Sequence, residues 1–358
     1  MKIKDIPSSI LKNVKRGVVI PAHPMALDSN RKLDERHQRA LTRYYLDAGV
    51  GGIAVGVHTT QFEIRKPEIG LYKPVLSLTS EIVDDYCSQT GREILKVAGV
   101  CGKTLQAVKE AMVAQETGFH SCLLSLADLQ EENILELITH CREVSKVIPI
   151  IGFYLQPKAG GRLLPYRFWR EFAEIENVLA IKIAPFNRYQ TIDVVRAVCE
   201  AGREKEIALY TGNDDNIVVD LLSEYKFNST SKTKSVRIAG GLLGHWAVWT
   251  KKAVELLEKI HSITKKNEPV PAEMLVMSSQ VTDANAAFFD AANDFVGCIP
   301  GIHEVLRRQG LMKGIWCLDS SQKLSPGQNE EIDRIYRAYP EMNDDSFVRE
   351  NLDRWLKD

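Results

Sequence analysis

The 358-residue sequence has no excess of charge of either sign, no long apolar run and no closely paired cysteines. Lys plus Arg total 46 against 47 for Asp plus Glu, so the charge balance gives no sign of nucleic-acid or anionic-membrane binding. No apolar run reaches the ~20 residues of a membrane span, and the first five residues lack the apolar core of a signal peptide. The seven cysteines include no Cys-x-x-Cys pair, which is typical of reduced thiols. We therefore expect a cytoplasmic protein with neither nucleic acid nor membrane as a partner.

What the sequence does contain is a strand-then-helix unit that recurs along the first 262 residues. Short runs rich in Val, Ile and Leu, bounded by turn or charged residues, predict eight strands. These are Gly17–Ala22, Gly51–Val57, Leu95–Val100, Ser121–Leu126, Pro149–Leu155, Val178–Ala184, Glu206–Gly212 and Ser235–Gly240. Segments with helical periodicity separate them, one of which, Ile192–Ala201, has Thr191 as its expected N-cap. Near-continuous apolar strands between helices indicate a parallel sheet, and eight units favour an α/β fold of the (β/α)8 TIM-barrel type.

The last hundred residues have a different pattern. A Lys-Lys-Asn-Glu-Pro stretch at residues 265–269 is typical of a linker, and the remainder is periodic in the manner of helices. The predicted helices are Ala272–Ala292, Ile302–Leu311, Ser325–Tyr339 and Asp344–Lys357. We expect residues 1–262 to form the barrel that carries the active site, and residues 263–358 to form a C-terminal helical extension packed on it.

The sixth predicted strand places one lysine among small side chains. Since side chains alternate along a strand, Lys182 shares a face with Ala180 and Ala184, while the branched residues point the other way. Burial lowers the pKa of a lysine amine, and a neutral amine can attack a ketone to form a Schiff base. A strand-end lysine in a salt bridge is the alternative. The same alternation in the fifth strand puts Gly152 and Tyr154 on the inner face.

Five motifs in order resemble those of the dihydrodipicolinate synthase/N-acetylneuraminate lyase family of class I aldolases. The resemblance runs from about residue 17 to residue 312. It rests on the segments Val18-Val19-Ile20-Pro21-Ala22-His23-Pro24, Gly56-Val57-His58-Thr59-Thr60-Gln61, Phe153-Tyr154-Leu155-Gln156-Pro157, Ala180-Ile181-Lys182-Ile183-Ala184 and Tyr210-Thr211-Gly212-Asn213-Asp214-Asp215. Tyr154 and Lys182 lie 28 residues apart, which is similar to the family's spacing.

The resemblance implies a lyase that forms an imine between Lys182 and an α-keto acid, such as pyruvate or a keto sugar acid. Tyr154 would move protons, hydrogen-bonded through Thr59. Substrate binding is expected from five further residues: His58, Thr60, Arg162, Asn213 and Gly241. An ungapped match puts His58 and Thr59 on the family's threonine pair, and a shift of one residue puts Thr59 and Thr60 there. The partners expected are the keto acid, an aldehyde for some reactions, and further copies of the chain in a dimer or tetramer. Neither a metal nor an organic cofactor is expected.

Three departures from the family pattern argue against dihydrodipicolinate synthase activity itself. Val57 interrupts the family's glycine signature, and the glutamate that follows the threonine pair is absent. The segment Ala127–Glu131 after the fourth predicted strand contains no tyrosine where the synthases carry an aromatic proton relay.

Three other interpretations remain open at this point. His23, His58 and His245 follow the first, second and eighth predicted strands, and histidine is a common metal ligand, so a metal-dependent hydrolase or lyase is one alternative. Gly240–Gly244 and Gly102-Lys103-Thr104 could cradle a phosphate group of a substrate. A catalytically silent barrel is the third, because a barrel fold alone does not imply activity.

Overall fold

The computed structural model describes residues 1–228, 233–266 and 268–357. These residues form two compact units. Unit 1 comprises residues 1–18 and 95–242, and unit 2 comprises the described residues of 19–94 and 243–358. The predicted boundary at residue 262 does not coincide with this division.

Unit 1 holds most of the parallel strands. They are β3 (Leu95–Val100), β4 (Ser121–Leu124), β5 (Ile150–Leu155), β6 (Val178–Ala184), β7 (Ala208–Thr211) and β10 (Gly240–Leu243, whose last residue belongs to unit 2). Its helices are α1 (Ser8–Arg16), α4 (Thr104–Glu116), α5 (Ile134–Val147), α6 (Tyr166–Phe172), α7 (Arg188–Glu200) and α8 (Ile217–Leu222). Each strand from β3 to β7 pairs in parallel with the next, and β10 pairs with β7.

The described residues of unit 2 form two strands and a second set of helices. The strands are β1 (Val19–Pro21) and β2 (Gly52–Val55). The helices are α2 (Glu35–Ala48), α3 (Tyr72–Thr90), α9 (Thr250–Lys266), α10 (Glu273–Phe288), α11 (Cys298–Arg308), α12 (Gln328–Ala338) and α13 (Asp345–Trp355). A parallel bridge between Ala22, the residue after β1, and Ala54 of β2 joins the two strands.

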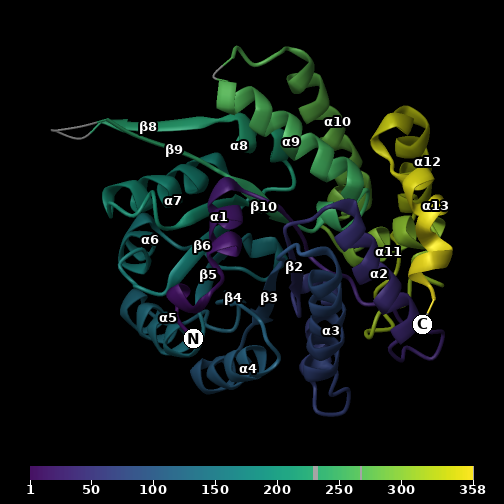
Figure 1. Cartoon of the computed structure of the whole chain (residues 1–358), viewed down its shortest axis with the longest axis horizontal. Coiled ribbons are helices and arrows are strands. Elements are labelled where there is room, and N and C mark those ends of the chain that lie inside the picture. Colours follow the sequence, from purple (N-terminus) through teal and green to yellow (C-terminus); the bar gives the residue numbers. More distant parts are fainter. Residues whose placement is uncertain (229–232, 267, 358) are drawn as a thin grey trace. The chain divides into compact units, whose positions relative to one another are not determined.

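The strand order along the sheet is β1-β10-β7-β6-β5-β4-β3-β2, with helices between successive strands (Figure 1). Eight parallel strands in this order, followed by C-terminal helices, constitute a (β/α)8 TIM barrel, so the predicted fold class is confirmed. β3 and β6 have the predicted bounds, and the other confirmed strands differ from prediction by a few residues.

The eighth strand was predicted at the wrong place. Residues 235–237 belong to β9 (Thr233–Arg237), which pairs antiparallel with β8 (Glu224–Asn228) in a separate hairpin. The barrel strand is instead β10, which begins at Gly240. A Cβ built on Gly240 would lie 2.6 Å from the backbone of Val18, so only glycine permits this close approach. The Gly240–Gly244 segment therefore lies mainly in β10.

Local signals explain where several helices begin and end. The side chain of Asn133 accepts a hydrogen bond from the Glu136 amide, and the Glu136 carboxylate accepts one from the Asn133 amide, which together form a capping box at the start of α5. Asn187 caps α7 through a single hydrogen bond that its side chain accepts from the Gln190 amide, so the predicted cap at Thr191 is wrong. α2 ends at Gly49, whose φ of 102° is accessible to glycine without strain.

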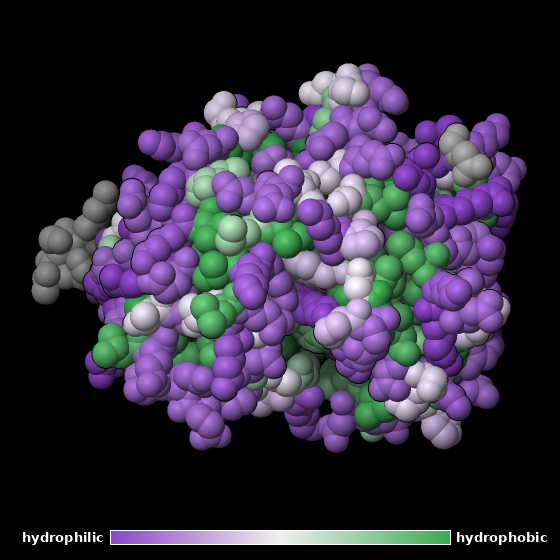
Figure 2. Space-filling view, turned by 90° about the horizontal axis from the view of Figure 1, so that it is seen from below, coloured by the Kyte–Doolittle hydropathy of each residue, from purple (hydrophilic) through white to green (hydrophobic). Residues whose placement is uncertain are grey.

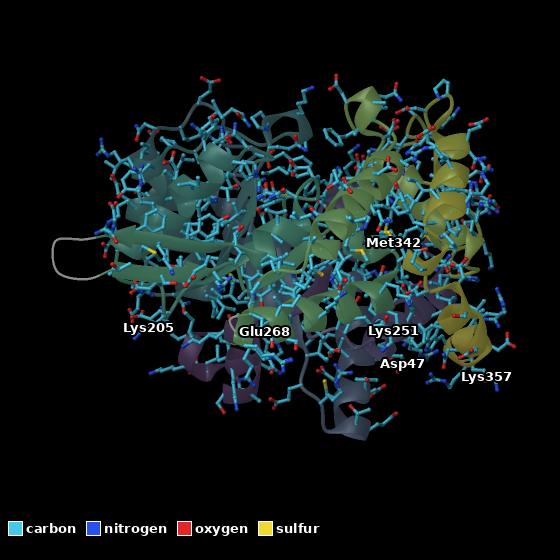
Figure 3. The ribbon with its side chains drawn as sticks, turned by 90° about the horizontal axis from the view of Figure 1, so that it is seen from above. Asp47, Lys205, Lys251, Glu268, Met342 and Lys357 are labelled. Atoms are coloured by element: carbon cyan, nitrogen blue, oxygen red, sulfur yellow. The ribbon has the colours of Figure 1, made fainter. Side chains whose placement is uncertain are left out.

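The C-terminal helices of unit 2 pack on α2. The Tyr44 hydroxyl donates to the Asp344 carboxylate at 2.7 Å, and Arg43 donates to the carbonyl of Trp355 at 2.6 Å and to that of Lys357. Asp47, at the end of α2, pairs with Arg354 at 2.7 Å (Asp47 and Lys357 are labelled in Figure 3). α9 runs to Lys266, through the first two residues of the predicted linker, and the next linker residue, Asn267, lies outside the described residues.

Hydrophilic side chains cover most of the face shown in Figure 2, and apolar ones are exposed in small groups. Within the described part of the chain, no helix combines the length and apolar character needed to cross a bilayer.

Candidate active site

Lys182 lies in the middle of the inner face of β6, as the alternation predicts. A Cβ built on Gly212, just beyond β7, would lie 2.6 Å from Lys182 Cε and 2.8 Å from Ala184 Cβ, so Lys182 and Ala184 share one face. In register with Lys182 are Phe153 on β5 and Tyr210 on β7. The lysine side chain therefore extends across the end of β7, over a glycine that leaves room for it.

The surroundings of the Lys182 amine are mainly apolar. Lys182 is only 8% exposed, and its Nζ lies 4.4 Å from the centre of the Phe153 ring. Burial lowers the pKa of Lys182 to about 8, although the nearby charge of Asp214 acts in the opposite direction. With that pKa about a tenth of the amine is neutral at pH 7, whereas an ordinary lysine is almost wholly protonated. The neutral form of a lysine amine is the form that can act as a nucleophile.

Tyr154 lies on the opposite face of β5, so the predicted inner face of this strand is wrong. Tyr154 is in register with Ile183, one residue beyond Lys182, and its ring packs against Trp169 of α6 at 5.3 Å between centroids. Its hydroxyl accepts a hydrogen bond from the Leu164 amide at 3.3 Å, and burial raises its pKa. Gly152 faces the same way, because a Cβ there would lie 2.8 Å from the Phe172 ring. The glycine makes room for a helix and not for the barrel interior.

Asn213 is part of a buried network behind the end of β7. Its Oδ1 accepts from the Phe186 amide at 3.0 Å, and its Nδ2 donates to Asp220 at 2.8 Å. Asp220 also accepts from the Thr211 hydroxyl at 2.8 Å, from Asn216 at 2.9 Å and from Arg188. The predicted substrate-binding amide is thus occupied by protein partners, and its role here is to hold the loops that follow β6 and β7.

Arg162 and Gly241 also have structural surroundings. The Arg162 guanidinium donates to the carbonyls of Leu129 and Glu132, the latter at 3.1 Å, and so ties the loop after β5 to the loop after β4. Gly241 is buried in β10 and pairs with Thr211. Neither residue is brought to Lys182 by any of these contacts.

The other predicted residues belong to unit 2. Thr59 and Thr60 lie in a short 3-10 turn, η2 (His58–Thr60), and are almost fully buried. The Thr59 hydroxyl donates to the Ala22 carbonyl at 2.8 Å and the Thr60 hydroxyl to the His23 carbonyl at 2.7 Å. Both hydroxyls therefore attach this turn to the end of β1. The ring of His58 lies 6.1 Å from that of Phe62.

The histidines of the metal alternative do not form a ligand set. His23 is fully buried, and its ring nitrogens lie 2.7 Å from the Pro24 carbonyl and 2.8 Å from the Thr42 hydroxyl. His245 stacks on Phe288 and borders an apolar cavity of about 240 Å³ that also meets Met342 (labelled in Figure 3). Among the residues that the structure describes, no group of three or more His, Cys, Asp or Glu is placed to hold a metal ion.

Neither the Phe153 ring beside the Lys182 amine nor the effect of the Asp214 charge on that amine was predicted from the sequence. Their positions depend on which residues of neighbouring strands are in register, and no local pattern in one strand carries that information. The only signal for Asp214 was its place in residues 210–215, one of the segments that resemble the family.

Comparisons with known proteins agree with this fold. Dihydrodipicolinate synthase from Oceanobacillus iheyensis is 16% identical with a TM-score of 0.71, and the match covers 92% of this chain and 99% of that chain. N-acetylneuraminate lyase from Fusobacterium nucleatum, complexed with pyruvate, is 16% identical with a TM-score of 0.70 over 92% and 99% of the two chains. Dihydrodipicolinate synthase from Cyanidioschyzon merolae, with lysine bound, is 18% identical with a TM-score of 0.71 over 90% and 97%. No curated protein matches the sequence.

A family model gives the more direct assignment. The model of the dihydrodipicolinate synthetase family matches residues 15–234, which is more than half of the chain. Members of this family are lyases of the Schiff-base-forming aldolase type, so the predicted enzyme class is confirmed. The chain belongs to the dihydrodipicolinate synthetase family.

Proposed function

We propose that the protein is a lyase that forms a Schiff base between Lys182 and the ketone of an α-keto acid. The observation that carries the proposal is the Lys182 amine itself, buried on β6 beside the Phe153 ring with its pKa lowered to about 8. Such an amine is deprotonated often enough at neutral pH to attack a carbonyl carbon. The protonated imine then accepts the electron pair left when a carbon–carbon bond breaks or a proton leaves carbon.

Pyruvate is the first keto acid to test, because one of the similar lyases has been solved in complex with it. A keto sugar acid is the second, in keeping with the name of that lyase. The reaction itself supplies its electron sink through the imine, so the proposal invokes no other reactive group. Tyr154 is not included, since its hydroxyl lies on the α6 side of β5.

Borohydride trapping tests the proposal. Reduction in the presence of pyruvate converts the imine into a stable secondary amine, and intact mass followed by peptide mapping locates it. We expect one adduct per chain on Lys182, and a rate of formation that rises with pH and levels off above about 8. No adduct with any keto acid would favour the catalytically silent barrel.

Matched variants make the assignment specific. Lys182→Met removes the amine and keeps an apolar chain of similar length, so we expect the adduct to disappear. Lys96→Met is the control, since Lys96 is also a buried lysine on a strand of unit 1, only 4% exposed. If the adduct persisted in Lys182→Met and disappeared in Lys96→Met, the residue that forms the imine would be Lys96 on β3 and not Lys182 on β6.

The oligomer expected from the family resemblance stays a prediction. Light scattering on the purified chain, with and without pyruvate, measures it directly.

A further inference from the structure

The nitrogen of Lys182 is buried against an aromatic ring. Nζ lies over the Phe153 ring, 4.4 Å from its centre, and the two residues are directly in register on β6 and β5. Each of them is only 8% exposed. The face of a benzene ring carries partial negative charge, so at this distance it attracts a cation, and the attraction is stronger where water is excluded.

The strands on both sides of β6 fix this contact. Side chains in register on neighbouring strands project from the same face of the sheet, so the Phe153 ring and the Lys182 chain lie side by side. On the other side of the lysine, a Cβ built on Gly212 would lie 2.6 Å from Lys182 Cε. The lysine is therefore placed between a glycine that leaves room for its chain and a ring that faces its nitrogen.

A buried lysine usually has a carboxylate as its partner, and Lys182 is held differently. Among the residues that the structure describes, no carboxylate forms an ion pair or a hydrogen bond with its nitrogen. The charge of Asp214, in the turn after β7, favours the ammonium from a distance. Tyr210, in register on β7, is neutral, and its hydroxyl donates to the Val14 carbonyl at 2.9 Å. The ring is thus the group in direct contact with the charge.

We propose that Phe153 is a positioning residue whose ring face holds the positively charged nitrogen of Lys182, first as the ammonium and then as the protonated imine. The inference rests on the proposed function of Lys182 and adds the group that stabilises its cationic states. The ring exchanges no proton, so this role is separate from that of any acid–base residue.

The charge balance of imine formation gives the ring a specific effect. Two of the three ammonium protons end on the carbonyl oxygen, which leaves as water, and the nitrogen forms two bonds to the keto carbon. The nitrogen therefore carries one positive charge before and after the reaction, whereas the attacking amine and the carbinolamine are neutral. The ring stabilises the two cations and not the two neutral states. A weaker ring face should release the amine at lower pH, and should weaken the imine only where the free lysine is neutral.

The test replaces Phe153 by phenylalanine analogues with one, two and three fluorine atoms, which weaken the negative ring face at nearly constant size. The first measurement is the pH at which half of the Lys182 amine reacts with a small acylating reagent, located by peptide mapping in the absence of any keto acid. We expect this midpoint to fall with each fluorine atom, by about one pH unit for three. The control places the same analogues at Phe347, whose ring lies 5.9 Å from Lys251 Nζ, and should leave the Lys182 midpoint unchanged.

The second measurement is the pyruvate concentration that gives half-maximal reductive trapping at pH 6 and at pH 9.5. With three fluorine atoms at residue 153, we expect the requirement to rise about tenfold at pH 9.5, because the protonated imine is then compared with a neutral amine. At pH 6 we expect no change, because the ammonium and the protonated imine lose the same stabilisation. A ring that only fills space would give no trend at either pH.

Each outcome decides. A midpoint that does not move with fluorine content, or that moves as much in the Phe347 series, overturns this inference and leaves Lys182 as the imine residue. A tenfold loss at both pH values also overturns it, because the ring would then act on packing or on the substrate and not on the charge of the nitrogen. If no keto acid gives an adduct while the midpoint still falls, the proposed function fails, and Phe153 is then a partner of the ammonium alone.

Discussion

The two units both bury ionisable groups, but they surround them differently. In unit 1 the Lys182 amine is placed beside an aromatic ring and near one carboxylate, and its pKa is lowered to about 8. In unit 2 burial lowers the pKa of three histidines, His23, His245 and His303, to about 4, so they are neutral at pH 7. Near neutral pH the lysine is therefore present in both its protonated and its neutral form, whereas the three histidines are present only in the neutral form.

This contrast shows how to separate a reactive buried group from a structural one. The ring nitrogens of His23 already contact Pro24 and Thr42, which leaves no lone pair for a metal or a substrate. Lys182 lies over a glycine that leaves room for its chain. The position of a residue after a strand therefore means little until its polar atoms are accounted for.

Filling the space at Gly212 tests the unit 1 half of the comparison most directly. Gly212→Ala places a methyl group 2.6 Å from Lys182 Cε and 2.8 Å from Ala184 Cβ, so the lysine must move. We expect imine formation with pyruvate to slow by roughly 10- to 100-fold, because small displacements of a reacting group are costly. Stopped-time borohydride trapping measures this rate.

A control for this variant is Gly91→Ala at the end of α3. Its φ is 68°, and a Cβ there meets nothing within 4 Å, so the substitution strains only the backbone. We expect a loss of about 1 kcal/mol in stability and an unchanged trapping rate. If Gly212→Ala trapped pyruvate at the wild-type rate, the reaction of Lys182 would not depend on the space that Gly212 leaves for its side chain.

The titration of Lys182 is expected to change the stability of the protein with pH. This effect is smaller than the expected effect of Gly212→Ala on imine formation. The folded pKa of Lys182, about 8, lies below the ordinary lysine pKa of 10.5, so the cost of the buried ammonium is present in full below pH 8 and disappears as pH rises to 10.5. Lys182→Met has no such cost. We therefore expect its stability relative to wild type to fall by about 3 kcal/mol between pH 7.5 and 10.5. Urea unfolding of both proteins across this range measures the difference, and parallel curves would contradict the lowered pKa.

The histidines of unit 2 predict the opposite pH window. Since burial lowers the folded pKa of His245 from 6.5 to about 4, its contribution is present above pH 6.5 and is lost as pH falls toward 4. His245→Phe keeps a flat ring against Phe288 and removes the titration. We expect this variant to lose less stability than wild type between pH 7 and 4.5, by roughly 2–3 kcal/mol. Equal losses in urea unfolding would mean that the pKa of the imidazole in the folded protein is not lowered from its ordinary value.

The fold was largely predictable because its signal is local and repeated. Each strand of the barrel is an apolar run between helices, and β3 and β6 were predicted to the residue. The error at the eighth strand has a physical cause. Residues 235–237 do form a strand, but only the pairing partner distinguishes a surface hairpin from the barrel, and that partner is not encoded in the segment itself.

The site was predictable only in part, and β6 and β5 show why. In β6 the alternation of alanines with branched residues distinguishes the two faces, so Lys182 could be placed. In β5 nearly every residue is apolar, and a register irregularity between Ile150 and Ile151 shifts the strand against β6. Gly152 therefore looked like interior space, although it accommodates the Phe172 ring. The order of the motifs predicted Tyr154 as a site residue, but only the pairing of β5 with β6 shows which face of β5 its side chain occupies.

The smallest predicted effect concerns the C-terminal helices, and it completes the contrast because it changes stability without changing chemistry. Arg43 of α2 donates to the Trp355 and Lys357 carbonyls at the end of α13, where a positive charge also favours the helix dipole. We expect Arg43→Gln to lower the free energy of unfolding by about 1 kcal/mol, to speed amide exchange in α13, and to leave pyruvate trapping unchanged. The matched control is Arg39→Gln one turn earlier, whose partner Glu81 is 56% exposed, so that its loss costs less than about 0.5 kcal/mol. Slower trapping in Arg43→Gln would show that the C-terminal helices influence the lysine, and the division between a chemical unit 1 and a structural unit 2 would then be wrong.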